Sequence, residues 1–563
     1  MLAVVHNVTA ATRMVDILTV LEGDLRLQVV FTVPGSSPFS HGTSDWLTSI
    51  GAIVVPWWQA KQLDVDLVIS ASHGGELHAL KAPIAIFPHG IGYNKYLDEP
   101  TSRRADEPTS RRAVFGLSAP WLMHDGRVIP DALVLSHVEQ FGRLRVACPE
   151  AVEVAVVAGD PCLDRLAASV HLRGAYRAAF GVVPGQRLVV VNSTWGPNSL
   201  FGTDPQVIQR LLGELPADEY RVVAALHPNI WHGHSPWQLR SGWLAEGCRC
   251  GLVLAPPFET WRAALVGADV VIGDHSSVTF YAAALGRPVL LAAAHLDGMD
   301  PASAVARFCA AAPRLRVDRG LAGQIEAVIA DSGADRYAAA TADATSAPGE
   351  AAARIRSTLY GLLGVPEPVV PAVTAVVAIP SQVTPQPVTA WLVAAETNAA
   401  TNAATVAETD ADGPRSRVRR YPAALRLADP PAGDTLLLVD LTHRDPSLLG
   451  LADATVGSTV DAQNDPDTWA GQVLPARPGC LVAAVTWPDG SCRVYQHTAT
   501  PVDLTPVPGQ RTADPMLAVS GWYGWLASGG STVAELTVTA GPITIRRRVT
   551  TGRAGQTDDP AER

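Results

Sequence analysis

The stretch ADVVIGDHSSVTFYAAALGRPVLLAA, residues 268–293, decides the fold. It opens with a short apolar run that ends at Asp274, and Ser276 and Ser277 follow at the place where a helix would be capped. A Gly-Arg-Pro turn at 286–288 ends that helix before a second apolar run begins. Strand, helix and strand in this order form a βαβ unit, whose two strands lie parallel in one sheet. The stretch therefore predicts an α/β domain with a parallel sheet.

Short apolar runs of the same kind precede this stretch in two series. Each is continuous, as strands buried on both faces are. The first series comprises residues 2–7, 27–33, 52–56, 66–71 and 83–90, and the second comprises residues 153–159, 188–194, 220–228, 251–256, 268–274 and 287–293. With a break near Asp160-Pro161, they predict two Rossmann-like domains that face each other. Because ligands bind outside the carboxyl ends of parallel strands, we expect a ligand in the cleft between the domains.

The rest of the chain differs in composition. Prolines recur between 366 and 387, and the run TNAATNAAT follows at 397–405, which predicts a linker. Farther on, residues 479–487 and 491–499 flank a Pro-Asp-Gly turn, and STVAELTVTA and PITIRRRVTT flank Gly541, so two β-hairpins are expected. We expect Rossmann-like domains at 1–155 and 156–364, a Pro/Ala/Thr-rich linker at 365–428, a small β-rich domain at 429–553 and a tail at 554–563.

Composition excludes several classes of protein. The 563 residues carry a formal net charge of −11, whereas a nucleic-acid scaffold needs a basic surface. No apolar run reaches the ~18 residues of a membrane helix, and the first twenty residues lack the features of a signal peptide. Seven cysteines are too few, and odd in number, for a disulfide framework. We therefore expect a cytoplasmic protein.

Basic residues are unevenly distributed. Lysine occurs only at positions 61, 81 and 95, which excludes lysine chemistry from the rest of the chain, and a GC-rich genome explains the bias. The run RSRVRR at 415–420 is interpreted as solvated, with peripheral contact with anionic lipid as the alternative. A tandem DEPTSRRA repeat at 98–105 and 106–113 is too short for a repeat architecture and indicates a tolerant surface loop.

Four strand ends carry residues suited to catalysis or phosphate binding. His89, followed by the loop glycine Gly90, could act as a general base, or could be a structural histidine. Ser193 and Thr194 could hold phosphate oxygens at a turn, with loop capping as the alternative. His227 precedes a proline that keeps it outside the next helix. Zinc is disfavoured there, since no carboxylate or cysteine lies at a usual ligand spacing.

The fourth strand end lies in the stretch quoted first. Asp274 ends its strand, and the helix capped by Ser276 and Ser277 presents N–H groups and the positive end of its dipole. The alternative is an ordinary serine cap of the helix. Such a cap does not require a second serine or an acid at the end of the preceding strand. The chain lacks the G-x-G-x-x-G, G-x-S-x-G and H-E-x-x-H motifs, which leaves phosphate handling by helix termini and histidines.

In this order, HG at 89–90, GDPCLD at 159–164, NST at 192–194, HP at 227–228 and DHSS at 274–277 resemble the CDP-glycerol glycerophosphotransferase family. This family comprises the teichoic acid primases and polymerases, with a glycosyltransferase-B fold of two Rossmann-like domains. The resemblance covers roughly residues 80–295. It implies an acceptor-side first domain, a second domain that binds the donor nucleotide, and neither metal nor cofactor.

The resemblance also implies roles for single residues. His89 matches the proposed base of the family, and His227 matches a histidine near the donor pyrophosphate. Ser276 and Ser277 match the serine pair at the donor phosphates, with Asp274 as the acid of that motif. The chain departs from the family at three positions, where it has His275 for tyrosine, and Cys162 and Gly196 for basic residues. Fewer basic groups near a diphosphate put the donor in doubt, since charge-assisted bonds to phosphate are the strong ones.

We therefore expect transfer of glycerol phosphate or a similar polyol phosphate from a CDP-alcohol to an acceptor hydroxyl in cell-wall or surface polymer synthesis. The acceptor would be lipid-linked or polymeric, with peripheral contact at the inner face of the plasma membrane. A nucleotide-sugar glycosyltransferase is the first alternative. A non-catalytic nucleotide-binding or scaffold protein is the second, and the presence of both His89 and His227 argues against it.

Overall fold

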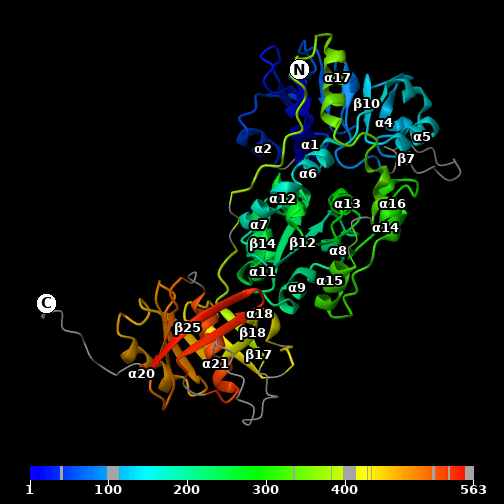
Figure 1. The fold of residues 1–563 in the computed structure, drawn as a ribbon. Helices are drawn as coiled ribbons and strands as arrows, with labels where there is room; N and C mark the ends of the chain where they lie inside the picture. Colours follow the sequence, from blue (N-terminus) through cyan, green and yellow to red (C-terminus); the bar gives the residue numbers. More distant parts are fainter. Residues whose placement is uncertain are drawn as a thin grey trace.

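The computed structural model describes residues 1–37, 42–97, 113–331, 333, 336–381, 383, 385–396, 414–427, 429–432, 434–509, 514–530 and 533–551. Two α/β domains and a β-barrel follow one another along the molecule, with the second α/β domain in the middle (Figure 1). The DEPTSRRA repeat, except for its last residue, the TNAATNAAT run and the expected tail lie outside the described residues. None of the helices in the described ranges has the length and apolar character that a membrane crossing requires.

The first domain is built on a seven-stranded parallel sheet in the order β11-β10-β5-β4-β1-β2-β3. Its strands are β1 (Leu2–Val4), β2 (Val30–Val33), β3 (Val54–Pro56), β4 (Val68–Ser70), β5 (Ile84–Ile86), β10 (Ala132–Leu135) and β11 (Ala155–Val157). Its helices are α1 (Val8–Leu18), α2 (Thr43–Ser49), α3 (Trp57–Ala60), α4 (Ala119–Leu122) and α5 (Val138–Ala147). Two short hairpins, β6 (Tyr96–Leu97) with β7 (Ala113–Val114) and β8 (Met123–His124) with β9 (Arg127–Val128), lie outside this sheet.

The second domain has a five-stranded parallel sheet in the order β14-β13-β12-β15-β16. Its strands are β12 (Arg187–Ser193), β13 (Tyr220–Leu226), β14 (Val253–Leu254), β15 (Val270–Gly273) and β16 (Val289–Leu291). Its helices are α6 (Pro161–Ala168), α7 (Arg173–Ala179), α8 (Leu200–Thr203), α9 (Val207–Glu214), α10 (Pro228–His234), α11 (Ala245–Arg249), α12 (Thr260–Gly267), α13 (Ser277–Ala284), α14 (Ala304–Ala311), α15 (Leu321–Ala330) and α16 (Ala338–Thr341). Both sheets have the strand order of a doubly wound Rossmann-like domain, so the expected α/β fold is confirmed.

Two segments lie in a different domain from the one expected. Residues 153–159 were expected to open the second series, but β11 pairs with β10 in the first sheet. Helix α17 (Ala351–Leu363), at the end of the expected second domain, packs into the core of the first, where Ile355 and Leu359 are buried with Met14 and Ile17. Figure 1 shows α17 beside α1. An apolar run indicates that a segment is buried, but it does not indicate which sheet the segment packs against. Both differences have this cause.

The C-terminal part is a closed nine-stranded barrel in the order β17-β18-β24-β25-β23-β22-β21-β20-β19. Its strands are β17 (Ala390–Glu396), β18 (Arg415–Pro422), β19 (Thr435–Asp440), β20 (Ala454–Ser458), β21 (Val482–Thr486), β22 (Cys492–Tyr495), β23 (Val502–Pro506), β24 (Glu535–Ala540) and β25 (Ile543–Thr551). Its helices are α18 (Ala423–Arg426), α19 (Pro446–Leu451), α20 (Pro466–Ala476) and α21 (Pro515–Ala527). Both predicted hairpins are confirmed as β21-β22 and β24-β25.

The barrel begins inside the stretch expected to be linker, because β17 and β18 lie within 365–428. The basic run at 415–420 is therefore part of a strand. Ser416, Val418 and Arg420 are buried, whereas the arginines between them are exposed, which is the period-two pattern of a strand with one buried face. In the sequence, the arginines of the exposed face make the run look basic throughout, so the alternation of buried and exposed residues is not apparent. The barrel also contains parallel pairs, β19-β20-β21, joined through helices, so it is not built of hairpins alone.

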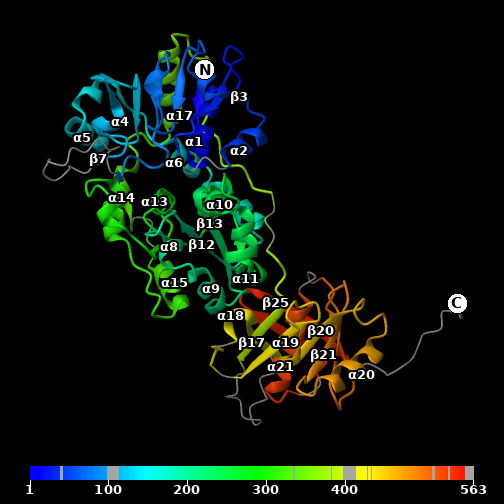
Figure 2. The same cartoon turned by 180° about the vertical axis from the view of Figure 1, so that it is seen from behind.

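An extended segment connects α17 to the barrel along the side of the second domain (Figure 2). Val377 is buried there: its N–H donates to Ser169 Oγ, and its carbonyl accepts from Tyr176 Oη at 2.6 Å. At the far end of the second domain, Leu425 of α18 packs against the domain core. The connecting segment and the barrel are therefore both packed against the second domain.

Candidate active site between the two α/β domains

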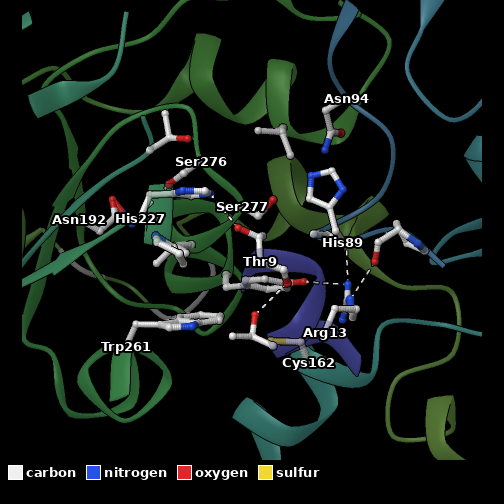
Figure 3. A pocket seen from close by; sticks show the side chains of 18 of the residues that line it. Thr9, Arg13, His89, Asn94, Cys162, Asn192, His227, Trp261, Ser276 and Ser277 are labelled. Carbon is white, nitrogen blue, oxygen red and sulfur yellow. Dashed lines mark hydrogen bonds between the residues drawn. The ribbon is translucent and has the colours of Figure 1, made fainter. Parts of the chain in front are cut away.

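A cleft lies between the two α/β domains, where the carboxyl ends of both sets of strands meet (Figure 3). Its empty space, open solvent at the mouth included, is about 1350 Å³. The sequence-predicted residues that line it are His89, Gly90, Ser193, Thr194, His227, Ser276 and Ser277. Asp274 lies beneath the lining and is fully buried. The structure therefore brings seven of the eight predicted residues to one cleft.

His89 follows β5 and presents its ring to the cleft. No hydrogen bond to this ring occurs within the described ranges, and its ring contact is with Phe115, at 6.2 Å between centroids. His89 is exposed, although it lies within the cleft, and partial desolvation there, with the charges of Lys95 and Arg13, lowers the pKa of His89 to about 4. A neutral imidazole with an open nitrogen can accept a proton.

Arg13 of α1 holds the backbone on both sides of His89. Its guanidinium donates to the carbonyl oxygens of Pro88 (2.8 Å) and Gly90 (2.7 Å). It also binds Asp160, at 2.7 Å, and both side chains are buried. Asp160 caps α6 and accepts a hydrogen bond from Tyr281 Oη of α13. One buried arginine thus connects the His89 loop to the second domain, and Figure 3 shows Arg13 below His89.

His227 follows β13 and caps α10. Its Nδ1 accepts a hydrogen bond from the Asn229 N–H at 3.1 Å, so the ring proton is on Nε2. Nε2 lies 3.3 Å from Thr9 Oγ1, on the first domain. Burial, with the charge of Lys95, lowers the pKa of His227 to about 3. His227 is therefore a neutral residue whose remaining ring group is a hydrogen-bond donor.

The N-terminus of α13 faces the loop after His89. Ser276 Oγ caps the helix by accepting from Thr279 N, and Ser277 Oγ accepts from Ile91 N of the first domain at 3.3 Å. Gly90 is pressed against this point, because a Cβ at Gly90 would lie 2.4 Å from Ser277 Oγ. Both serines thus have structural contacts, and with Val278 they line the cleft at the N-terminus of α13.

Asp274 and Ser193 organise the loop that follows β12. Asp274 Oδ2 accepts hydrogen bonds from the backbone N–H groups of Thr194 (2.8 Å) and Leu200 (3.0 Å) and from Ser193 Oγ. Ser193 Oγ also accepts from Phe201 N. These contacts hold the loop at 194–200 in place. This structural role explains the acid at the end of the strand better than contact with a phosphate does.

Lys95 is one of the cleft residues that sequence reasoning missed, with Arg13 and His73. It lines the cleft from the first domain, and its backbone forms an isolated β-bridge with Met299 of the second. Its side chain is exposed, but desolvation by the cleft walls lowers its pKa, opposed by Asp274, and its charge lowers the pKa of both His89 and His227. Basic charge at the cleft therefore comes from the first domain as well. Its place six residues after His89, as the last lysine of the chain, was the available signal.

The departures from the family pattern lie at or near this site. Cys162 and His275 line the cleft. Burial raises the pKa of Cys162 to about 12, so the thiol is neutral, and burial lowers the pKa of His275 to about 4. Gly196 has φ +92°, and a Cβ there would have no atom within 4 Å. Within the described residues, no group of three or more His, Cys, Asp or Glu side chains is arranged to hold a metal ion.

No known protein family matches the sequence, and no curated protein does. Among solved structures, the chain is similar to the wall teichoic acid polymerase TagF, with 14% identity, a TM-score of 0.43 and a match covering 65% of this chain and 89% of that one. It is similar to S. aureus MnaA in a structure with UDP (13%, TM-score 0.36, 65% and 97% covered). It is also similar to Anabaena HepE in complex with UDP and glucose (11%, TM-score 0.35, 64% and 98% covered). Similarity at this level says nothing about the donor or acceptor of this chain.

Proposed function

We propose that this chain is a transferase that moves glycerol phosphate, or a similar polyol phosphate, from a CDP-alcohol to an acceptor hydroxyl in cell-wall or surface polymer synthesis. The acceptor is lipid-linked or polymeric and is reached from the cytoplasmic side. One observation carries the proposal: two neutral histidines, His89 and His227, line one interdomain cleft. They differ in hydrogen bonding, because Nδ1 of His227 accepts from a backbone N–H whereas the His89 ring has no such bond within the described residues. It is further supported by the five family-like motifs, since each contributes a residue to the lining.

In the proposed reaction, His89 acts on the acceptor. Its open ring nitrogen accepts the proton of an acceptor hydroxyl while the oxygen attacks the β-phosphorus of the donor. The new P–O bond replaces the bond to the departing CMP. General base catalysis of this kind typically contributes 10²- to 10⁴-fold in rate. Arg13 is the positioning residue, because it holds the carbonyl groups on both sides of His89.

The donor phosphates in this proposal bind on the other side of the cleft. CMP leaves with added negative charge, which the Nε2–H of His227, the N-terminus of α13 and the ammonium of Lys95 stabilise. The hydroxyl of Thr194 is a further phosphate contact. Lys95 compensates for the basic residues that Cys162 and Gly196 replace.

A thermal-shift screen tests the donor class. We expect CMP, CDP-glycerol or CDP-ribitol to raise the melting temperature, because a ligand that binds only the folded state stabilises it. A response confined to UDP-sugars or GDP-sugars would instead favour a glycosyltransferase. If no nucleotide changes the melting temperature, the proposal is overturned, and a non-catalytic scaffold is the interpretation that remains.

His89→Ala tests the base. We expect transfer to fall by about 10²- to 10⁴-fold while nucleotide affinity stays within a few-fold, since His89 acts on the acceptor. Substitution of His78, an exposed histidine of the same domain, to Ala is the matched control and should leave transfer unchanged. Equal losses of transfer and of nucleotide binding in His89→Ala would contradict the assignment.

A further inference from the structure

His73 is a second histidine on the acceptor side of the cleft, and the proposed reaction does not use it. It lies in the loop after β4, and β4 pairs in parallel with β5, whose end carries His89. Both loops therefore leave the same edge of the sheet. His73 lines the cleft and is only 7% exposed.

Aromatic rings fix the place of His73. The Phe115 ring lies 5.6 Å from the His73 ring, edge-on, and 6.2 Å from the His89 ring, so both imidazoles flank one phenyl group. Tyr93 packs edge-on against His73 at 5.7 Å. Gly116 has φ +85°, and a Cβ there would lie 2.7 Å from His73 Nε2. The surroundings are thus shaped closely around this ring.

Neither ring nitrogen of His73 has a hydrogen-bond partner in the part of the chain that the structure describes. Burying an unpaired polar group is unfavourable, and a leucine or phenylalanine would fill the same space without that cost. Burial, with the nearby His89 and His6, lowers the pKa of His73 to about 3, so the ring is neutral. A neutral imidazole offers one donor and one acceptor, which is also what a hydroxyl group offers.

We propose that His73 binds a second hydroxyl of the acceptor, next to the one that His89 deprotonates, so that the acceptor is a polyol or sugar end with neighbouring hydroxyl groups. This inference rests on the proposed function, since it names the acceptor class of the same cleft. Phe115, which also lines the cleft, offers an apolar face to the C–H groups of such an acceptor. A neutral ring in this position selects hydroxyl groups rather than a charged group.

The test compares 1,2-propanediol with 1-propanol as acceptors and CDP-glycerol as donor. His73→Phe retains an aromatic ring of similar size and removes both nitrogens, whereas His73→Gln retains a donor and an acceptor. We expect His73→Phe to lower kcat/KM for 1,2-propanediol about tenfold through KM, to leave 1-propanol unchanged, and to leave CMP affinity unchanged by calorimetry. His73→Gln should recover most of the loss, and His78→Gln should show none.

An equal loss on both acceptors in His73→Phe, or no loss on either, would overturn the inference. Ligand-observed NMR of 1,2-propanediol with each variant gives a second readout that needs no turnover, and we expect its saturation transfer to weaken in His73→Phe. If the wild-type chain transfers nothing from any nucleotide donor, yet binds the diol in a manner that depends on His73, the proposed function fails and the diol site stands. If it binds no diol, the inference fails as well.

Discussion

At the scale of single residues, the cleft depends on a glycine that allows the two domains to meet. Gly90 lies against Ser277, and the backbone N–H of the next residue, Ile91, donates a hydrogen bond to Ser277 Oγ. The HG motif therefore carries two functions. His89 supplies chemistry, and Gly90 supplies the space that lets the loop reach α13.

Gly90→Ala should lower transfer by roughly 10- to 100-fold, because the new methyl group displaces the His89 loop from α13. The steric conflict is with Ser277 Oγ, so Gly90→Ala combined with Ser277→Ala should recover part of the loss relative to Gly90→Ala alone. Steady-state kinetics of the three variants measure this. Strictly additive losses would show that the contact does not limit the loop.

The pH dependence of kcat/KM should show its acid limb near pH 4 rather than near 6.5. The base works only when neutral, so activity falls as the pH drops through the pKa of His89, which is about 4 in the free protein. Lys95→Met removes a positive charge that lowers this pKa, and the limb should therefore move to higher pH even though the overall rate falls. A limb that stays in place in Lys95→Met would contradict the assignment of His89.

At the scale of elements, α1 supports the site although it carries no recognisable motif. Its eleven residues bury Arg13 and Asp16 at the domain boundary. Asp16 binds Arg165 and Arg262 of the second domain, all with side chains at most 7% exposed. A helix that buries two charged groups needs partners for both, and these partners come from the facing domain.

Arg13→Lys should lower kcat by about tenfold or more while the affinity for CMP stays within a few-fold. Lysine keeps the charge opposite Asp160, but a single ammonium does not have the planar fork that binds Pro88, Gly90 and Asp160 together. Arg26→Lys, at an exposed arginine of the same domain, is the control. A loss of CMP affinity as large as the loss of kcat would show that Arg13 does not act through the His89 loop.

At the scale of the whole molecule, a buried ion pair holds the barrel on the second domain. Arg420 of β18 is 3% exposed, binds both oxygens of Asp218 at 2.7 and 2.8 Å, and stacks on Trp391. Its carbonyl accepts from Ala217 N. The charged run that the sequence reading assigned to solvent thus contains the residue that docks the barrel.

Arg420→Met should release the barrel, because it leaves Asp218 buried without its partner, at a cost of about 3–5 kcal/mol. Small-angle scattering should report a larger radius of gyration, and Asp218→Asn in the same chain should reverse most of the change. Arg417→Met, at an outward-facing arginine of the same strand, is the control. An unchanged radius in Arg420→Met would show that other contacts suffice.

The sequence by itself determined the α/β class, the two parallel sheets and both barrel hairpins, and seven of the eight site residues it predicted line the cleft. These features follow from local rules: strand runs are short and apolar, and parallel strands bring their carboxyl ends to one edge. Tertiary structure alone decided that β11 and α17 belong to the first domain, that residues 415–420 form a barrel strand, and that Arg13, His73 and Lys95 join the site. Burial patterns are local, whereas the choice of partner depends on which distant elements pack together, and one chain segment does not carry that information.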